Sequence, residues 1–256
     1  VPRRARETLL DQRHMDLALA IQQATEDIVL RLAETAKQLT GADYLVMAGG
    51  VALNCVANGK LIRRGTFKDL WIQPAAGDAG GALGAALAAR HIWQGQDRQI
   101  PCPRMDHMAG SYLGPEFGAD DILRVARRHR APYQHYPDYA DLVRDSAALL
   151  AQGQVVGWFQ GRMEWGPRAL GNRSILGDPR HPEMQKRLNL KIKYREGFRP
   201  FAPSVLYEET ANYFELDRPS PYMLLVAPVN EARRNPLPPG YDSLELFDRL
   251  YHLRSD

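Results

Sequence analysis

From Gly161 to Arg199 the chain reads GRMEWGPRALGNRSILGDPRHPEMQKRLNLKIKYREGFR, and this stretch is the natural starting point. It contains ten Lys or Arg against four Asp or Glu, a local excess of six in a chain whose formal net charge is only +3. Gly166, Pro167 and Gly171 interrupt any long helix, so the stretch begins as a loop. Arginine can grip a phosphate or a carboxylate with two N–H groups at once. We therefore favour a site for several negative charges over a solvated basic surface.

The bulk properties are those of a soluble globular protein. The 256 residues are 45% hydrophobic and 25% charged, enough for one large domain or two ordinary ones. No apolar run approaches the roughly 20 residues of a membrane-spanning helix, and no signal peptide is visible. Cys55 and Cys102 lack metal-ligand or redox spacing, which predicts reduced thiols and a cytoplasmic protein. The chain starts with Val and ends in a helical pattern without a stop signal, so we expect a piece of a longer protein.

The first half predicts alternating strands and helices. A first helix with Asp16 as its cap and Gly41 beyond its end carries apolar residues at helical spacing, which predicts a core-facing side: Leu17, Ile21, Ala24, Ile28 and Leu32. Residues 44–48 and 70–73 are apolar runs of strand length, and each leads through a glycine-rich turn into a helix. The pattern is typical of an α/β fold with its ligand crevice at the strand ends.

Two features of these turns allow a functional interpretation. Gly49-Gly50 follows the first strand, where backbone N–H groups and a helix dipole can approach a phosphate or a nucleoside. A tight turn with close helix–sheet packing explains the same glycines equally well. Asp78 is the only charged residue between Asp69 and Arg90. It can be a helix cap or a ligand of a metal or nucleotide, and the window alone leaves both open.

The second half is less regular. Residues 92–113 are polar with prolines and no periodicity, which predicts a linker and a domain boundary near residue 110. We expect helices at 115–130, 141–152 (with Gly153 as a left-handed cap) and 184–190, and strands at 133–136, 155–159, 204–206 and 222–227. Lys191, Lys193 and Arg195 alternate, so an extended segment would point all three to one face.

Four long motifs resemble a known family. GRMEWGPRALGNRSI and KIKYREGFRPFAPSV resemble the C-terminal signature of the antibiotic and nodulation-factor O-carbamoyltransferases. MAGGVALNCVANGKL and PAAGDAGGALGAA resemble the second half of that family's N-terminal domain, and the resemblance covers roughly residues 16–228. It implies an α/β fold in two parts. Residues 1–109, with the linker, would be the second half of an actin/hexokinase-type ATPase-like domain similar to the threonylcarbamoyl-transferases. Residues 110–256 would be a YrdC-like α/β domain, incomplete at its C-terminus.

The resemblance also implies an activity. Carbamoyl phosphate and ATP would give carbamoyl adenylate, and the carbamoyl group would pass to a hydroxyl of a sugar-containing acceptor such as a Nod factor or an antibiotic. An iron-type divalent metal would lie near the transfer site, and Mg²⁺ is possible with ATP. The expected partners are these substrates, with no membrane, no nucleic acid and a possible homodimer.

Specific residues follow from the same resemblance. The resemblance implies catalytic roles for Arg168, Lys193 and Arg199, and it implies that Asp78 is a metal ligand. Binding of the nucleotide and carbamoyl phosphate falls on Gly49, Gly50, Asn54, Arg162, Arg168, Arg173, Arg195 and Arg199.

The chain departs from the family at the metal site. The family also uses a histidine pair spaced HxxxH, and no two of the seven histidines here are four apart. The first strand layer of the ATPase fold is missing too, so we expect an incomplete metal site. Two alternatives are a tRNA threonylcarbamoylation-type enzyme and a nucleotide-binding module without catalysis. A tRNA-modifying enzyme would favour a broad basic surface in both halves of the chain. The N-terminal half is instead nearly neutral beyond its N-terminal tail.

Overall fold

A computed structural model describes residues 10–98 and 106–255, so Cys102 lies outside the described residues. The chain divides into two compact units. The first takes the described residues up to Ala88 together with Leu224–Val226, and the second takes Ala89–Met223 and the residues from Ala227 on. This division concerns the packing of this chain alone, so the domain boundary at residue 110 stays a prediction. None of the described helices is both long and apolar enough to cross a membrane.

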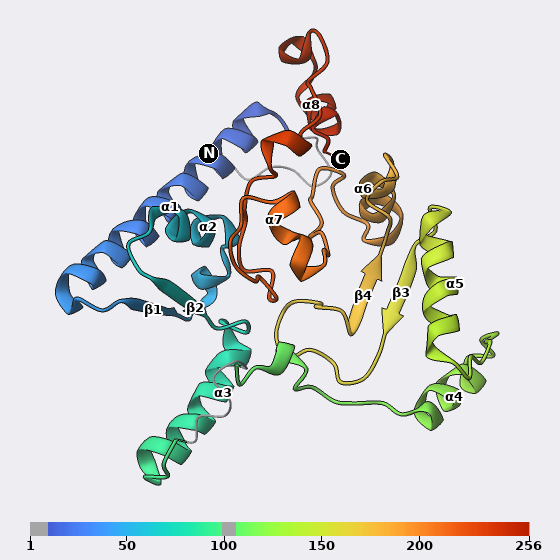
Figure 1. Ribbon diagram of the computed structural model, residues 1–256, viewed down its shortest axis with the longest axis horizontal. Coiled ribbons are helices and arrows are strands. Elements are labelled where there is room, and N and C mark those ends of the chain that lie inside the picture. The colour runs from blue at the N-terminus through green and yellow to red at the C-terminus, as the bar shows by residue number, and fades with distance from the viewer. Residues whose placement is uncertain (1–9, 99–105, 256) are drawn as a thin grey trace. The chain divides into compact units, whose positions relative to one another are not determined.

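The described part of the first unit is a pair of parallel strands with three α-helices (Figure 1). Strand β1 pairs with β2 in a register that joins Tyr44 to Asp69 and Met47 to Ile72. Because the strands are parallel, the turns that follow them lie at the same edge, and the amide of Gly49 donates to Ala76 O at 2.8 Å. The elements are α1 (Gln12–Thr40), β1 (Tyr44–Met47), α2 (Cys55–Arg64), β2 (Asp69–Ile72) and α3 (Asp78–Ala88).

Helix α1 differs from the sequence expectation at its start and at its packed face. Asp11 caps it rather than Asp16, while Gly41 follows its end, as expected, and adopts a left-handed conformation with φ 64°. The predicted core-facing side is wrong for this chain, since Ile21 is 67% exposed and the other four residues of that side are exposed as well. The buried residues are Glu26, Val29 and Ala33. Apolar periodicity marks a face suited to burial, but within this chain α1 packs beside α2 through the opposite one.

A short segment far along the chain completes the first unit. Residues 224–226 lie against α2, where the buried Asn58 Nδ2 donates to Leu224 O at 3.0 Å and Val226 N donates to Cys55 O at 3.1 Å. Arg63 Nη1 donates to Val226 O at 3.0 Å. These bonds go to the helix and to side chains rather than to a neighbouring strand, so the strand predicted at 222–227 is wrong.

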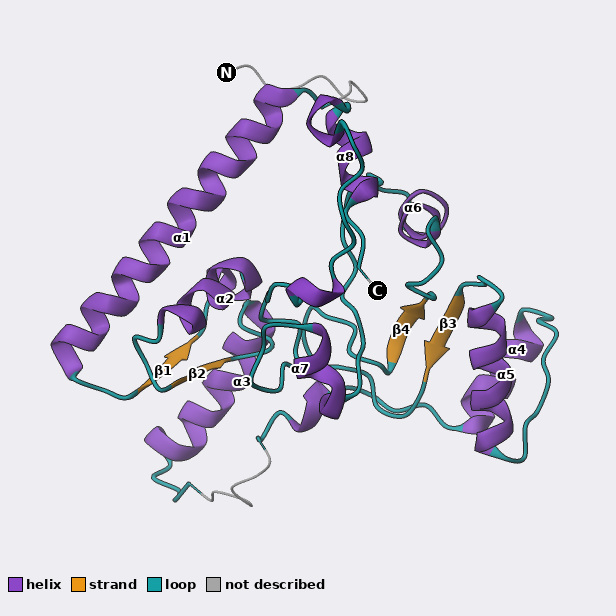
Figure 2. Ribbon diagram, turned by 45° about the horizontal axis from the view of Figure 1, so that its top comes forward, coloured by secondary structure: helices purple, strands orange, loops and turns teal. Residues whose placement is uncertain are grey.

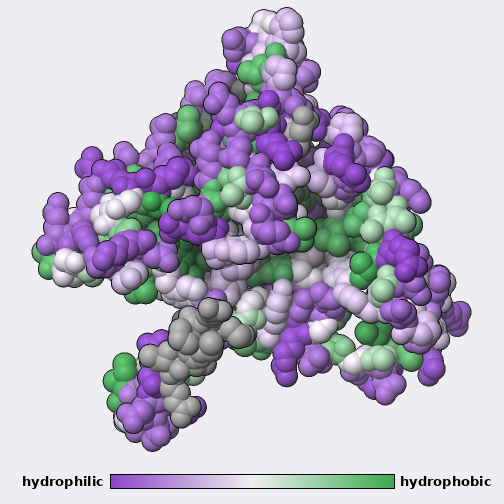
Figure 3. All heavy atoms as spheres, viewed as in Figure 1, coloured by the Kyte–Doolittle hydropathy of each residue, from purple (hydrophilic) through white to green (hydrophobic). Residues whose placement is uncertain are grey.

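The second unit is built around an antiparallel pair of strands (Figure 2). Val156 pairs with Leu176 and Phe159 with Arg173, and α5 packs beside β3. Figure 3 shows apolar and hydrophilic residues interleaved over α4 and α5. The elements are α4 (Ala119–Arg128), α5 (Tyr139–Ala151), β3 (Val156–Phe159), β4 (Arg173–Leu176), α6 (Met184–Arg187), α7 (Thr210–Tyr213) and α8 (Leu246–His252).

Several expectations for this unit need correction. The structure confirms the helix ended by Gly153, whose φ is 77°, and the strand near 155–159. It has no strand at residues 133–136 or 204–206, and it places an unexpected strand, β4, inside the basic stretch. The linker expectation is wrong for residues 106–113, because Met108 and Ser111 there are buried. The mixture of helices and small sheets leaves the two implied domain folds as predictions.

Candidate functional site

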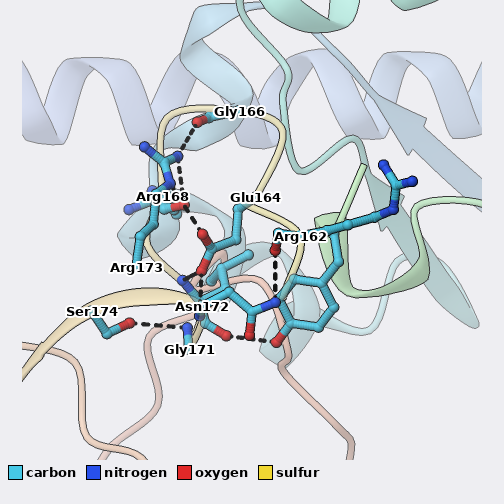
Figure 4. A network of polar contacts seen from close by, with 10 residues as sticks. Arg162, Glu164, Gly166, Arg168, Gly171, Asn172, Arg173 and Ser174 are labelled. Carbon is cyan, nitrogen blue, oxygen red and sulfur yellow. Dashed lines mark hydrogen bonds and ion pairs between the residues drawn. The ribbon is translucent and has the colours of Figure 1, made fainter. Parts of the chain in front are cut away.

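The first part of the basic stretch folds around a buried carboxylate rather than an arginine. Glu164 Oε1 accepts the backbone N–H groups of Leu170 at 2.6 Å and of Asn172 at 2.9 Å, and its side chain is fully buried (Figure 4). Residues 164–173, which we call the arginine loop, therefore wrap around their own acidic residue. A loop with no regular hydrogen-bond ladder needs such an acceptor, because buried N–H groups are costly when left unpaired.

Arg173 completes this arrangement from the first residue of β4. Its Nε donates to Glu164 Oε2 at 3.0 Å, and its Nη2 donates to Gly166 O at 2.8 Å and Arg168 O at 3.3 Å. The guanidinium thus spans the loop from the buried acid to two carbonyl groups on the opposite side. These contacts make Glu164 and Arg173 a hydrogen-bonded ion pair inside the loop.

The electrostatics of Glu164 follow from these contacts. Burial of its carboxyl group raises the pKa, but the two backbone N–H donors and Arg173 outweigh burial and hold the pKa of Glu164 below its ordinary value. The carboxylate in turn acts on Tyr112, whose pKa is raised first by burial and then by the charge of Glu164. Glu164 is therefore a fixed negative charge within a positively charged stretch.

A second segment holds the arginine loop from its other side. Tyr112 Oη donates to Leu170 O at 2.8 Å, and Trp165 N donates to Ser111 O at 2.6 Å. Gly114 N donates to Met163 O at 2.9 Å just before the loop. The segment 106–116, which the sequence suggested as mostly linker, is thus part of the candidate site.

That segment is anchored in turn by a buried tyrosine. Tyr222 Oη lies 2.8 Å from both carboxylate oxygens of Asp106 and accepts the N–H of Gly110 at 3.2 Å. Burial raises the pKa of Tyr222 well above its ordinary range, and the hydrogen bond to Asp106 raises this pKa further. Ala109 and Ser111 have positive φ values of 45° and 67°, which side-chain-bearing residues adopt only when their surroundings enforce it.

A second group of predicted residues gathers around the fully buried Asn189. Arg195 Nε donates to Asn189 Oδ1 at 2.7 Å, while Asn189 Nδ2 donates to Arg199 O at 2.8 Å. The Arg195 guanidinium stacks on Phe201 at 4.9 Å, and Arg199 forms an exposed ion pair with Glu196 at 2.8 Å. Asn189 therefore connects the backbone and side chains that carry two of the predicted ligands.

The expected alternation of three basic residues is wrong. Lys191 lies in a helical turn over Leu188–Ile192, and Tyr194 has a φ of 48°, so the segment is not extended. Lys193 is exposed, whereas Arg195 is half-buried. The side-chain period of two holds only for extended backbone, and the buried Asn189 bends this segment instead.

Arg162 stands apart from both groups. Its Nη1 donates to Gly114 O at 3.1 Å, and its Nε lies 3.6 Å from Glu116 Oε2. More than half of its side chain is exposed. Arg168 is half-buried and lies in the arginine loop, as does Arg173. Of the predicted ligands, this loop therefore brings Arg168 and Arg173 together.

In the first unit, the glycine turn has the openness that a ligand needs. Gly49 has a φ of 95°, which favours glycine, and a Cβ added at Gly49 or Gly50 would meet nothing within 4 Å. Asn54 is used within the protein: its Oδ1 accepts from Ala57 N at 3.1 Å as a helix cap, and it exchanges two hydrogen bonds with Gln22. The backbone of the Gly49-Gly50 turn is therefore open to a ligand, whereas the Asn54 side chain is already hydrogen-bonded within the protein.

Asp78 begins α3 and is exposed. Among the described residues no group of three or more His, Cys, Asp or Glu could hold a metal ion. The residues present therefore do not fit a divalent metal by themselves, and the role of Asp78 as a ligand stays a prediction.

Sequence reasoning missed Glu164, Tyr112 and Asn189 as residues that shape the site. Glu164 carried a signal, because it is the only acidic residue from Arg162 to Arg173. Tyr112 and Asn189 carried none, since their partners are known only once the chain is folded.

Comparison with known proteins matches two family models to the chain. The carbamoyltransferase N-terminus model matches residues 3–87, and the carbamoyltransferase C-terminus model matches residues 147–241. The chain belongs to the carbamoyltransferase family. The match confirms the resemblance seen in the four motifs and places the Gly49-Gly50 turn in the N-terminal model and the arginine loop in the C-terminal one.

Relatives of the carbamoyltransferase family resemble most of the chain. It is 56% identical over 256 residues to the Synechocystis protein named sll1178, covering 99% of this chain and 41% of that protein. It is 44% identical to the nodulation protein NolNO of Sinorhizobium fredii (88% of this chain, 32% of the relative). It is 36% identical to the 3'-hydroxymethylcephem-O-carbamoyltransferase of Streptomyces clavuligerus (81% and 37%). The chain thus spans about two fifths or less of the length of these relatives.

Proposed function

We propose that the protein acts as an ATP-dependent O-carbamoyltransferase. Carbamoyl phosphate, water and ATP are converted to carbamoyl adenylate with release of phosphate and pyrophosphate. The carbamoyl group then passes to an acceptor hydroxyl, and AMP leaves. The observation that carries the proposal is the match of both the N-terminal and the C-terminal carbamoyltransferase models, in that order, on one chain. Relatives that are named O-carbamoyltransferases support the second step.

The chemistry of the second unit suits the first step. ATP and carbamoyl phosphate together bring several phosphate groups, and the transfer reactions of phosphates rely mainly on positioning and charge neutralisation. Arg168 on the arginine loop would contact a transferring group. Lys193 and Arg199, on the turn organised by Asn189, would add positive charge, with Mg²⁺ as the companion of ATP.

The first unit would handle the nucleotide end and the transfer. The open turn at Gly49 and Gly50 would accept the adenosine part, because backbone N–H groups without side chains can come close to it. Asp78 follows the neighbouring strand and would be one ligand of an iron-type metal.

The acceptor would present a hydroxyl group. The relatives include proteins named as nodulation proteins and a 3'-hydroxymethylcephem-O-carbamoyltransferase. A sugar-containing acceptor, as in a nodulation factor or a glycosylated antibiotic, is the class that we propose.

A substitution at Arg168 tests the proposal. Arg168→Ala in the complete protein should abolish pyrophosphate release that depends on carbamoyl phosphate. Arg180→Ala is the matched control from the same basic stretch, since Arg180 is exposed and bonded to Asp178 at 2.6 Å. Unchanged pyrophosphate release in Arg168→Ala would remove Arg168 from the mechanism. If the wild type itself releases no pyrophosphate with both substrates, the proposed first step is wrong.

A further inference from the structure

The arginine loop poses a structural problem that one acidic residue solves. It contains Gly166 and Gly171 with φ values of 114° and 116°, and Pro167 contributes no N–H group. Such a loop has many accessible conformations and few internal hydrogen bonds to select one. The N–H groups of Leu170 and Asn172 converge on one oxygen of Glu164, so the carboxylate selects the conformation.

The guanidinium of Arg173 is directed into the protein. Its Nε and Nη2 make three hydrogen bonds, to Glu164 and to the carbonyl groups of Gly166 and Arg168. Its side chain is 33% exposed, and its counter-ion is a carboxylate with no exposed surface. A phosphate that drew Arg173 away would leave Glu164 buried without its positive partner, which is costly.

The carbonyl side of the loop is held as firmly as its N–H side. Leu170 donates its N–H to Glu164 and accepts at its carbonyl oxygen from Tyr112 Oη. Arg168 lies two residues away, and its own carbonyl oxygen accepts from Arg173. The backbone on both sides of Arg168 is therefore tied to three side chains: Glu164, Arg173 and Tyr112.

We infer that Glu164 and Arg173 form a positioning pair that, with Tyr112, fixes the backbone presenting Arg168. Arg173 serves the loop and is not a ligand of substrate phosphate. The inference rests on the proposed function for the role of Arg168, and it replaces the binding role that the family resemblance implies for Arg173.

A double-mutant cycle separates the two roles. Glu164→Gln, Arg173→Gln and the double variant are prepared in the complete protein, and kcat and KM for pyrophosphate release are measured with carbamoyl phosphate and ATP. Each single change misplaces the loop and should lower kcat/KM by about 100-fold, because small misplacements of a catalytic group are that costly. The two amides of the double variant can bond to each other. We expect its loss to be no larger than that of Arg173→Gln alone.

The opposite result would follow if Arg173 held phosphate. Removing it would then weaken binding whatever stands at position 164, so the two losses would multiply and overturn the inference. If Arg173→Gln fails to fold, Glu164→Gln combined with Arg173→Met decides, since it buries no lone charge. A loss no larger than the roughly 100-fold loss of Glu164→Gln alone supports the positioning pair, and any further loss beyond it overturns the inference.

Two further measurements extend this test, and the second does not depend on the proposed function. Tyr112→Phe removes only the hydroxyl and should lower kcat with little change in the KM for ATP, while Arg180→Ala serves as the unaffected control. Amide hydrogen exchange at Leu170 and Asn172 should become faster in Glu164→Gln, even if the wild type releases no pyrophosphate. Unchanged exchange at these amides would overturn the positioning role, whereas faster exchange without wild-type activity would leave the pair intact and reject the proposed function.

Discussion

Gly59→Ala is the most informative change in the first unit because two effects of opposite sign compete. Gly59 lies inside α2, where alanine is normally favoured over glycine by about 0.5–1 kcal/mol. A Cβ at this position would overlap the carbonyl oxygen of Val226, lie 3.2 Å from its carbonyl carbon and lie 3.3 Å from Arg63 Nη1. The backbone of residues 224–226 would have to move.

The magnitude follows from the bonds that this movement breaks. The segment is held by Asn58 Nδ2 to Leu224 O, Arg63 Nη1 to Val226 O and Val226 N to Cys55 O. Each is worth about 0.5–1.5 kcal/mol net, so losing all three costs about 1.5–4.5 kcal/mol. After the helix preference is subtracted, Gly59→Ala should lower the free energy of unfolding by about 0.5–4 kcal/mol.

Urea denaturation of the purified protein, followed by circular dichroism, measures this difference. Gly84→Ala is the matched control, because Gly84 lies inside α3 and an added Cβ there meets nothing within 4 Å. The control should stabilise by about 0.5–1 kcal/mol. Equal effects of the two substitutions, or a more stable Gly59→Ala, would refute the close packing of residues 224–226 on α2.

Two other predictions concern the charged groups. The pKa of Glu164 lies below its unfolded value of about 4.3, so its contribution to stability is present above that pH and is lost as the pH falls through the folded pKa. The difference in unfolding free energy between wild type and Glu164→Gln should shrink between about pH 7 and about pH 3, and a difference independent of pH contradicts this. In the complete protein, Asp78→Ala should spare pyrophosphate release but lower the amount of bound iron; unchanged iron content, measured by atomic emission, would mean that Asp78 is not a metal ligand.

Features encoded by neighbouring residues were predictable. The strand–glycine–helix order of the first unit, the left-handed ends at Gly41 and Gly153, and the helix near residues 141–152 all follow from local periodicity and from the freedom of glycine. The family was also predictable, because motifs such as the one around Arg168 are contiguous in the sequence and can be read without the fold. Apolar periodicity was less informative for α1, since it shows which face suits burial but not what covers it.

By itself the sequence determined the family, the positions of the main helices and the concentration of positive charge between residues 161 and 199. Only the tertiary structure decided how that charge is used. It buried Glu164 inside the arginine loop, brought Tyr112 to Leu170, 58 positions along the chain, and joined Asn58 to Leu224, 166 residues away. Such pairs leave no periodic pattern, because a hydrogen bond depends on where two groups lie in space and not on their spacing in the chain. For that reason Arg173 looked like a phosphate ligand in the sequence, while its contacts direct it to a buried carboxylate.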